Sequence, residues 1–166
     1  MGVRRAVSDE MTLPVLVAAL LIGVSASGCL QEPPGAYRPL YPAVDAAADP
    51  LFAVFESRIP CADCEKIKVA LALYRDRDTD APTTYKLARV YVARSPEDRI
   101  VVEGTWAIAH GTKLDPHAVV YQLDAHAPRD FQLYWAIGPD ILFMLDEARN
   151  PRVGTAGYGY ALNRTH

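Results

Sequence analysis

Short runs of β-branched and aromatic residues, separated by turn sequences, make up the chain from Phe52 onward. Such residues favour strands because their side chains pack well on a pleated, half-buried surface. Turns rich in proline, aspartate and glycine divide the runs at hairpin spacing. We therefore predict an all-β fold of seven or eight antiparallel strands curled into a small barrel. After the first run at Phe52, the predicted strands lie in residues 67–73, 85–91, 100–108, 119–121, 133–135, 141–143 and 158–162.

The periodicity is clearest in two of these runs. In residues 67–73, large apolar side chains alternate with lysine and alanine, as in a strand with one buried face. The run 85–91 keeps the same period of two, but the charge of Arg89 interrupts its apolar side. The alanine-rich residues 71–74 leave an alternative open, which is a helix extending from Cys64.

The first 28 residues have the layout of a secretory signal. Arg4 and Arg5 precede an uncharged apolar run, and the small residues Ala26-Ser27-Gly28 end it. The most apolar part, residues 13–26, would be roughly 21 Å long as a helix, short of a hydrocarbon core of ~30 Å. We predict a signal peptide in residues 1–28, with an uncleaved membrane anchor and plain secretion as the alternatives.

Cys29 stands directly after these small residues, where a bacterial lipoprotein carries its lipid. The residues before it resemble the lipobox that a lipoprotein peptidase reads. Each buried methylene of an acyl chain such as palmitate contributes about 0.8 kcal/mol, so several chains attach a protein firmly to a membrane. Because Asp after the cysteine usually retains a lipoprotein at the inner membrane, Leu30 predicts the outer membrane. We expect the lipid anchor to hold the protein there on the periplasmic face.

Residues 29–50 differ in composition from the rest of the chain. Prolines, Gly35 and a run of alanines occur there, and such sequences are extended and fold poorly. We predict that 29–50 is a lipidated flexible tether and that 51–166 is the barrel domain. Packing of Tyr37, Leu40 and Tyr41 on the domain surface is an alternative that can coexist with a tether.

Composition limits the functions open to the chain. It has a formal net charge of −3, whereas nucleic-acid binding normally requires a clustered basic face, so we expect no nucleic-acid partner. Apolar residues make up 51% of the chain, enough to build a core. Ser57 and Ser95 lack a nucleophile-elbow motif, and nothing in the spacing of Glu56 and Glu103 demands a glycosidase. We predict that the protein is not an enzyme.

Cys61 and Cys64 form a Cys-x-x-Cys motif, which can be a disulfide, a redox-active thiol pair or a two-thiolate metal site. A disulfide that closes a loop of about four residues stabilises a fold by only about 2 kcal/mol. Catalytic redox motifs usually sit in a βαβ unit, which is missing here, and the charges of Asp63 and Glu65 disfavour a thiolate. These arguments favour a disulfide, then metal binding or redox sensing, and catalysis last.

Two thiolates without a second cysteine pair suit Cu(I) better than a four-sulfur zinc site. The metal prediction therefore places Cu(I) on Cys61 and Cys64. His110, His117, His126 and His166 are the histidines that can lend a nitrogen ligand.

The hexapeptide Ile59-Pro60-Cys61-Ala62-Asp63-Cys64 resembles the Leu-Pro-Cys-Ala-Asp-Cys signature of the NlpE N-terminal domain family. Further similarities follow in order. Glu103-Gly104-Thr105-Trp106 resembles the family's Glu-Gly-x-Trp strand, Leu145-Asp146 its late turn, and Tyr160-Ala161-Leu162 its closing strand. The likeness extends from about Phe52 to Arg164.

The resemblance implies a lipocalin-like barrel and an outer-membrane lipoprotein linked to copper tolerance and envelope stress. It also implies a partner in envelope-stress signalling, with Cys61 and Cys64 as the site residues. The sequence departs from the family pattern at Ser57, where a glycine is common, and in a longer first hairpin at 78–84. No second domain follows Arg164, so we do not expect signalling that depends on one.

Trp106 and Trp135 are the two tryptophans of the chain. We expect them to fill the barrel interior, and barrels of about eight strands can also hold one small molecule. The alternative function is therefore a carrier of a small apolar ligand, with Trp106 and Trp135 lining its cavity.

Overall fold

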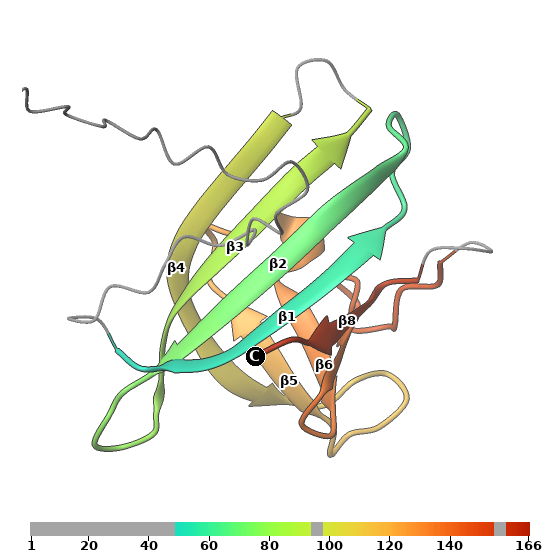
Figure 1. The fold of residues 1–166 in the computed structure, drawn as a ribbon. Coiled ribbons are helices and arrows are strands. Elements are labelled where there is room, and N and C mark those ends of the chain that lie inside the picture. Colours follow the sequence, from blue (N-terminus) through green and yellow to red (C-terminus); the bar gives the residue numbers. More distant parts are fainter. Residues whose placement is uncertain (1–48, 94–97, 155–158) are drawn as a thin grey trace, which may run out of the picture. The chain divides into compact units, whose positions relative to one another are not determined.

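The computed structural model describes residues 49–93, 98–154 and 159–166. Within these residues, eight antiparallel strands follow one another and close into a barrel (Figure 1), which confirms the predicted fold class. Strand β8 returns to β1, where Phe55 lies opposite Arg164 and Glu56 opposite Asn163. The elements are β1 (Leu51–Ile59), β2 (Lys66–Arg75), β3 (Pro82–Val92), β4 (Asp98–His110), β5 (Val119–Leu123), the 3₁₀ turn η1 (Arg129–Phe131), β6 (Leu133–Ile137), β7 (Ile141–Met144) and β8 (Ala161–Arg164).

Two local expectations were wrong. The alternative of a helix from Cys64 fails because β2 is a strand that pairs with β1 on one side and β3 on the other. Pairing along both edges overrides the helical preference of its alanines. The last strand begins at Ala161, later than the predicted run 158–162, since the chain still bends at Tyr160. Tyr158 lies outside the described residues.

Side chains that alternate along the strands fill the barrel interior. Each inward residue of β2 is at most 8% exposed, as the period of two in this run predicted. Burying one such side chain contributes roughly 1.5–3 kcal/mol. The largest members of the interior cluster are Phe55, Leu71, Leu73, Tyr85, Leu87, Trp106, Tyr134, Leu142 and Met144.

A smaller cluster covers the other face of the sheet. Val54, Ala72 and Tyr74 pack together with Leu51, and the first three are at most 2% exposed. Val54 lies between Ala53 and Phe55, which belong to the interior cluster, so it occupies an outward position. Strands β1 and β2 are therefore buried on both faces in this region.

Further hydrogen bonds between residues near both ends of the described domain stabilise the closure of β8 against β1. The Ser57 hydroxyl donates a hydrogen bond of 2.6 Å to the Ala161 carbonyl. Arg164 donates to the Phe52 carbonyl at 2.9 Å, and the Thr165 amide donates to the Val54 carbonyl at 2.8 Å. These contacts add to a pairing of only two registered residue pairs.

The first four strands are long, with 9 to 13 residues each, while β5 to β8 have 4 or 5. Register brings Ile59 opposite Ile67, Ile67 opposite Tyr91 and Tyr91 opposite Asp98, so β1 and β3 end, and β2 and β4 begin, at the same end of the barrel. The Cys-x-x-Cys motif lies in the connection between β1 and β2 at this end. The described part of the chain contains no helix that is long and apolar enough to cross a membrane.

Candidate functional site: the disulfide loop and the barrel end beside it

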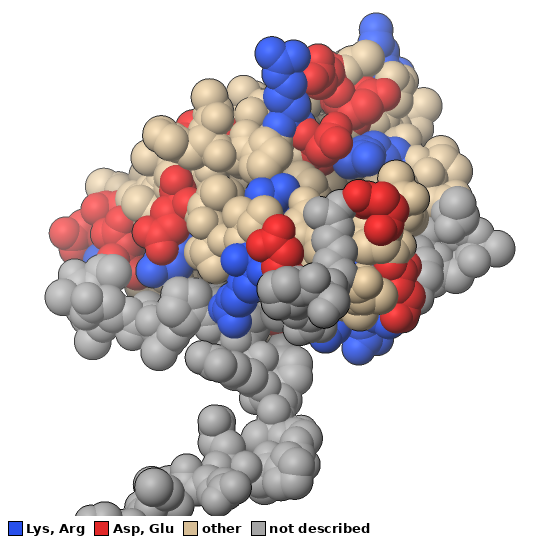
Figure 2. Space-filling view, turned by 90° about the horizontal axis from the view of Figure 1, so that it is seen from above, with Lys and Arg blue, Asp and Glu red and all other residues tan. Residues whose placement is uncertain are grey.

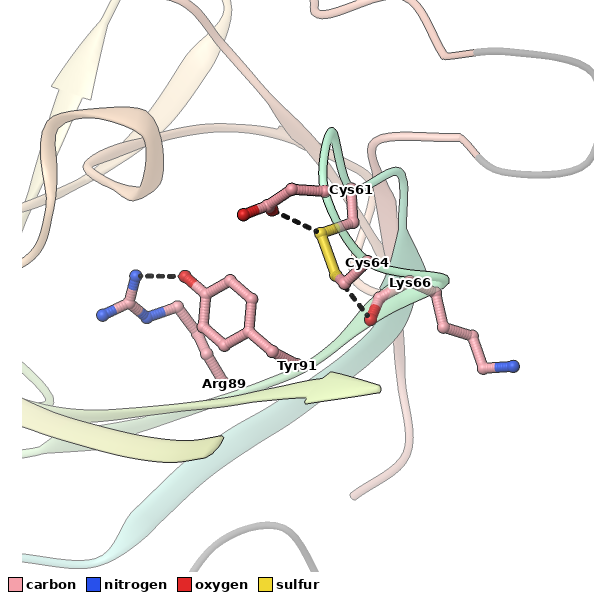
Figure 3. Close-up of a disulfide and its surroundings, with 6 residues drawn as sticks. Cys61, Cys64, Lys66, Arg89 and Tyr91 are labelled. Atoms are coloured by element: carbon pink, nitrogen blue, oxygen red, sulfur yellow. Dashed lines mark hydrogen bonds between the residues drawn. A yellow bond between two sulfur atoms is a disulfide. The ribbon is translucent and has the colours of Figure 1, made fainter. Parts of the chain in front are cut away.

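The connection between β1 and β2 carries the cysteine pair. Cys61 and Cys64 form a disulfide with their Cα atoms 5.3 Å apart (Figure 3). Both cysteines are half-buried and pack against the interior cluster, whereas Ala62 and Asp63 between them are exposed. The disulfide is therefore supported by the core on one side and close to solvent on the other.

The local sequence explains why the loop forms there. Pro60 lacks a backbone N–H and so cannot donate to the ladder that ends at Ile59. At the other end of the loop, the Glu65 amide donates a hydrogen bond of 3.2 Å to the Val92 carbonyl, which ties the loop to β3. Buried Ile59 and Ile67 fix the start and finish of the loop on the core.

The two sulfur atoms lie beside hydrogen-bond acceptors. Cys61 Sγ is 3.5 Å from Asp63 Oδ1, and Cys64 Sγ is 3.4 Å from the Lys66 carbonyl oxygen. Disulfide sulfurs carry no hydrogen, so these are only close contacts in the oxidised protein. After reduction, each thiol can donate a hydrogen bond to its neighbouring oxygen, and such bonds favour the neutral thiol. Since the thiolate is the reactive nucleophile, the arrangement suits a slow redox pair better than a catalyst.

The same loop contains a group that can hold a metal. The ligand atoms of Cys61, Asp63 and Cys64 all lie within 4.8 Å of one another. Two sulfurs suit a soft cation such as Cu(I), provided that the disulfide is reduced first. Among the described residues, no histidine joins this group. Copper binding stays a prediction.

The other predicted site residues lie elsewhere. Cys29 is outside the described residues. Trp106 is buried in the interior cluster, where its Nε1 donates a 2.7 Å hydrogen bond to the Tyr74 carbonyl. Trp135 is half-buried and follows the inward Tyr134 along β6, so it occupies an outward position. The two tryptophans therefore do not line one space, and their role in ligand binding stays a prediction.

Arg89 is the main feature of this barrel end that sequence reasoning missed. The charged side chain points inward, where it is only 7% exposed. Its Nη1 donates to the Tyr91 hydroxyl at 3.2 Å, and its guanidinium carbon lies 5.0 Å from the centre of the Phe131 ring. Figure 3 shows the Tyr91 ring between this guanidinium and the disulfide. The period of two placed Arg89 on the inward face, and that signal alone would have found it.

Asp124 is a second residue that sequence reasoning missed, and unlike Arg89 it has no sequence signal. Its carboxylate accepts hydrogen bonds from the Thr105 amide at 2.7 Å, the Thr105 hydroxyl at 3.0 Å, the Tyr85 hydroxyl at 3.2 Å and the His126 amide at 3.0 Å. Burial raises the pKa of Asp124, but the hydrogen bonds from Thr105 and His126 outweigh it and hold the pKa far below the ordinary value. Burial and the neighbouring carboxylate raise the pKa of Tyr85. Asp124 is thus an ionised hub that joins β3, β4 and the turn after β5.

The described surface shows one open depression and a mixed distribution of charges. Figure 2 shows acidic and basic side chains interspersed on one face, without a broad patch of a single sign. One open depression lies between the loops at 110–116 and 147–149. Arg149 spans part of it by donating to the carbonyls of His110 at 2.6 Å and Gly111 at 2.9 Å, so its charge is used within the loops.

Two solved structures resemble the chain. A candidate lipoprotein of Shewanella oneidensis is 23% identical with a TM-score of 0.45, and the likeness covers 68% of this chain and 87% of that one. The Cpx pathway activator NlpE from Escherichia coli is 25% identical with a TM-score of 0.41, and the likeness covers 64% of this chain and 48% of that one. No curated protein matches the chain in sequence. The sequence profile of the NlpE N-terminal domain matches residues 55–155, which include Cys61 and Cys64. The chain therefore belongs to the NlpE N-terminal domain family.

Proposed function

We propose that this protein is a non-enzymatic lipoprotein of the bacterial envelope, and that its Cys61–Cys64 pair senses envelope stress or copper. The half-buried disulfide in a barrel of the NlpE family is the observation that carries the proposal. The sensor has two states, one with the Cys61–Cys64 disulfide and one with two thiols. A partner in an envelope-stress signalling system distinguishes these states. The Escherichia coli member of known structure is described as a Cpx pathway activator, which supports this assignment.

The position of the pair favours sensing over stabilisation. Closing so short a loop contributes only about 2 kcal/mol, while the core supplies many buried side chains of comparable value each. Exposure of Ala62 and Asp63 lets a redox partner or a metal reach the loop. The envelope is an oxidising compartment, where such a disulfide persists once formed unless it is reduced.

The anchor completes the proposal. Residues 1–28 act as the signal peptide, Cys29 carries the lipid, and residues 29–50 form the tether before the barrel domain of 51–166. In this proposal, the lipid and the tether keep the barrel domain near the periplasmic face of the outer membrane. Mass spectrometry of protein from native membranes tests it, because acylation at Cys29 adds the mass of its acyl chains to a chain that lacks residues 1–28.

An envelope-stress reporter in cells tests the sensor role. Overproducing the wild-type protein is expected to change the reporter output relative to cells that do not overproduce it. Producing Cys61→Ser/Cys64→Ser protein at the same level is expected to give an output different from that of the wild-type protein. Ala62→Ser is the matched control, since it adds a hydroxyl to the same exposed loop and keeps both sulfurs. A double variant that signals like the wild type, with and without added copper, would reject the sensor role.

Cu(I) binding is the second candidate function, and the compact group of Cys61, Asp63 and Cys64 favours it. Reduced full-length protein titrated with Cu(I) against a competing chelator is expected to bind one equivalent. The Cys61→Ser/Cys64→Ser variant is expected to bind none. Equal copper retention by both proteins would exclude this site.

A further inference from the structure

The barrel encloses the cationic side chain of Arg89, which has no counter-charge among the described residues. Arg89 is only 7% exposed, and no carboxylate of the described residues lies within ion-pair distance of it. Its contacts are the hydroxyl of Tyr91 and the ring face of Phe131, both uncharged groups. Removing a guanidinium from water is costly unless an anion or a full set of hydrogen bonds compensates it. The interior therefore supplies only part of what Arg89 requires.

The unused part of the guanidinium has the shape of an anion-binding site. Nη1 bonds to Tyr91, whereas Nε is buried and has no hydrogen-bond partner. The described contacts of Arg89 leave its Nε–Nη2 edge without an acceptor. Two parallel N–H groups along this edge match the two oxygens of a carboxylate.

A second orphaned donor lies close by. Tyr134 is fully buried, and its hydroxyl also has no hydrogen-bond partner. Arg89 is near enough for its charge to lower the pKa of the Tyr134 phenol, although burial raises that pKa by more. Buried polar atoms without partners are rare in native proteins, so these two donors, whose side chains interact electrostatically, call for a common explanation.

We propose that Arg89 and Tyr134 bind the carboxylate of a small organic acid inside the barrel, beneath Tyr91 at the disulfide end. The Nε–Nη2 edge of Arg89 donates two hydrogen bonds to the ligand, and the Tyr134 hydroxyl donates a third. The rings of Tyr91 and Phe131 border the guanidinium, so the remainder of the acid is apolar and rests against them. This binding site is separate from the sulfur chemistry and does not depend on it.

Isothermal titration with hexanoate tests the site, using the full chain purified in dodecyl maltoside. Hexan-1-ol, of the same chain length but uncharged, is expected to bind at least about tenfold more weakly, because a charge-assisted hydrogen bond is worth roughly 1.5–3 kcal/mol. The Nε–H resonance of Arg89 is expected to shift as hexanoate is added. Equal binding of hexan-1-ol, or tighter binding of inorganic phosphate, would overturn the proposal.

Single substitutions test whether Arg89 and Tyr134 bind the carboxylate. Arg89→Lys keeps the charge but loses the planar fork, and it is expected to weaken hexanoate binding about tenfold. Tyr134→Phe removes only a hydroxyl and is expected to weaken binding about threefold to tenfold. Tyr85→Phe is the matched control, since the Tyr85 hydroxyl already has a partner in Asp124, and it is expected to bind hexanoate like the wild type. If Arg89→Lys fails to fold by circular dichroism, Tyr134→Phe decides, and unchanged affinity there would overturn the proposal.

Discussion

The carboxylate of Asp124 lies where a side chain of residue 104 would be. A Cβ atom added to Gly104 would stand 2.6 Å from Asp124 Oδ2, too close for any real contact. Because Gly104 has no side chain, the Asp124 carboxylate can approach the Thr105 amide and hydroxyl directly. The Glu-Gly-x-Trp motif at residues 103–106 thus has a physical reason for its glycine.

Gly104→Ala is expected to destabilise the barrel. The added methyl group must displace Asp124 or distort β4, and overpacking of this kind costs about 1–3 kcal/mol. Urea unfolding followed by circular dichroism measures the loss. Gly159→Ala is the matched control, because its nearest neighbour would be 3.9 Å away, and its midpoint is expected to stay near that of the wild type. Equal midpoints for both variants would contradict the close approach of Asp124.

Asp124→Asn is expected to lose about 2 kcal/mol near pH 7, since the amide cannot accept all of the carboxylate's hydrogen bonds. The pKa of Asp124 is lower in the barrel than in the unfolded chain, where it is about 3.9. Its stabilisation is therefore complete above about pH 4 and disappears as the pH falls further. Urea midpoints from pH 7 downward are expected to show the gap between wild type and variant closing in acid. A gap that does not change with pH would mean that the carboxylate charge is irrelevant.

Reducing the disulfide is expected to leave the barrel folded. The short loop contributes at most about 2 kcal/mol, and the buried contacts of Ile59 and Ile67 remain. Thermal unfolding of Cys61→Ser/Cys64→Ser protein, and of wild type with reductant, is expected to show a modest and equal decrease in Tm. Collapse of the fold in either sample would show that the pair is a structural staple instead.

Trp106→Phe is expected to cost about 2–4 kcal/mol. It removes the hydrogen bond to the Tyr74 carbonyl and leaves a cavity beside the Phe52 and Tyr121 rings, whose centres lie 6.0 and 5.0 Å from that of Trp106. Trp135→Phe serves for comparison and is expected to cost less than about 1.5 kcal/mol, because Trp135 is half-buried. Free energies from urea unfolding separate the two. A larger loss at Trp135 would contradict their placement.

Local pattern was sufficient for the barrel and for the disulfide loop. Alternation of apolar residues in β2 and β3 depends only on the two-residue repeat of a strand, and Cys61 and Cys64 are close in sequence. The inward charge of Arg89 was visible as an irregularity, but its contact with the Phe131 ring joins two elements far apart in the sequence. The contact of Gly104 with Asp124 likewise joins residues that no periodicity relates. Long-range contacts of this kind arise from tertiary packing alone.

The sheet begins and ends with strands that need each other. Because β1 pairs with β2 on one side and with β8 on the other, the barrel cannot complete its hydrogen-bond ladder until β8 has formed. A partly synthesised or partly exported chain would leave the outer edge of β1 unsatisfied and open to pairing with another molecule. Formation of β8 therefore protects β1 from pairing with other molecules.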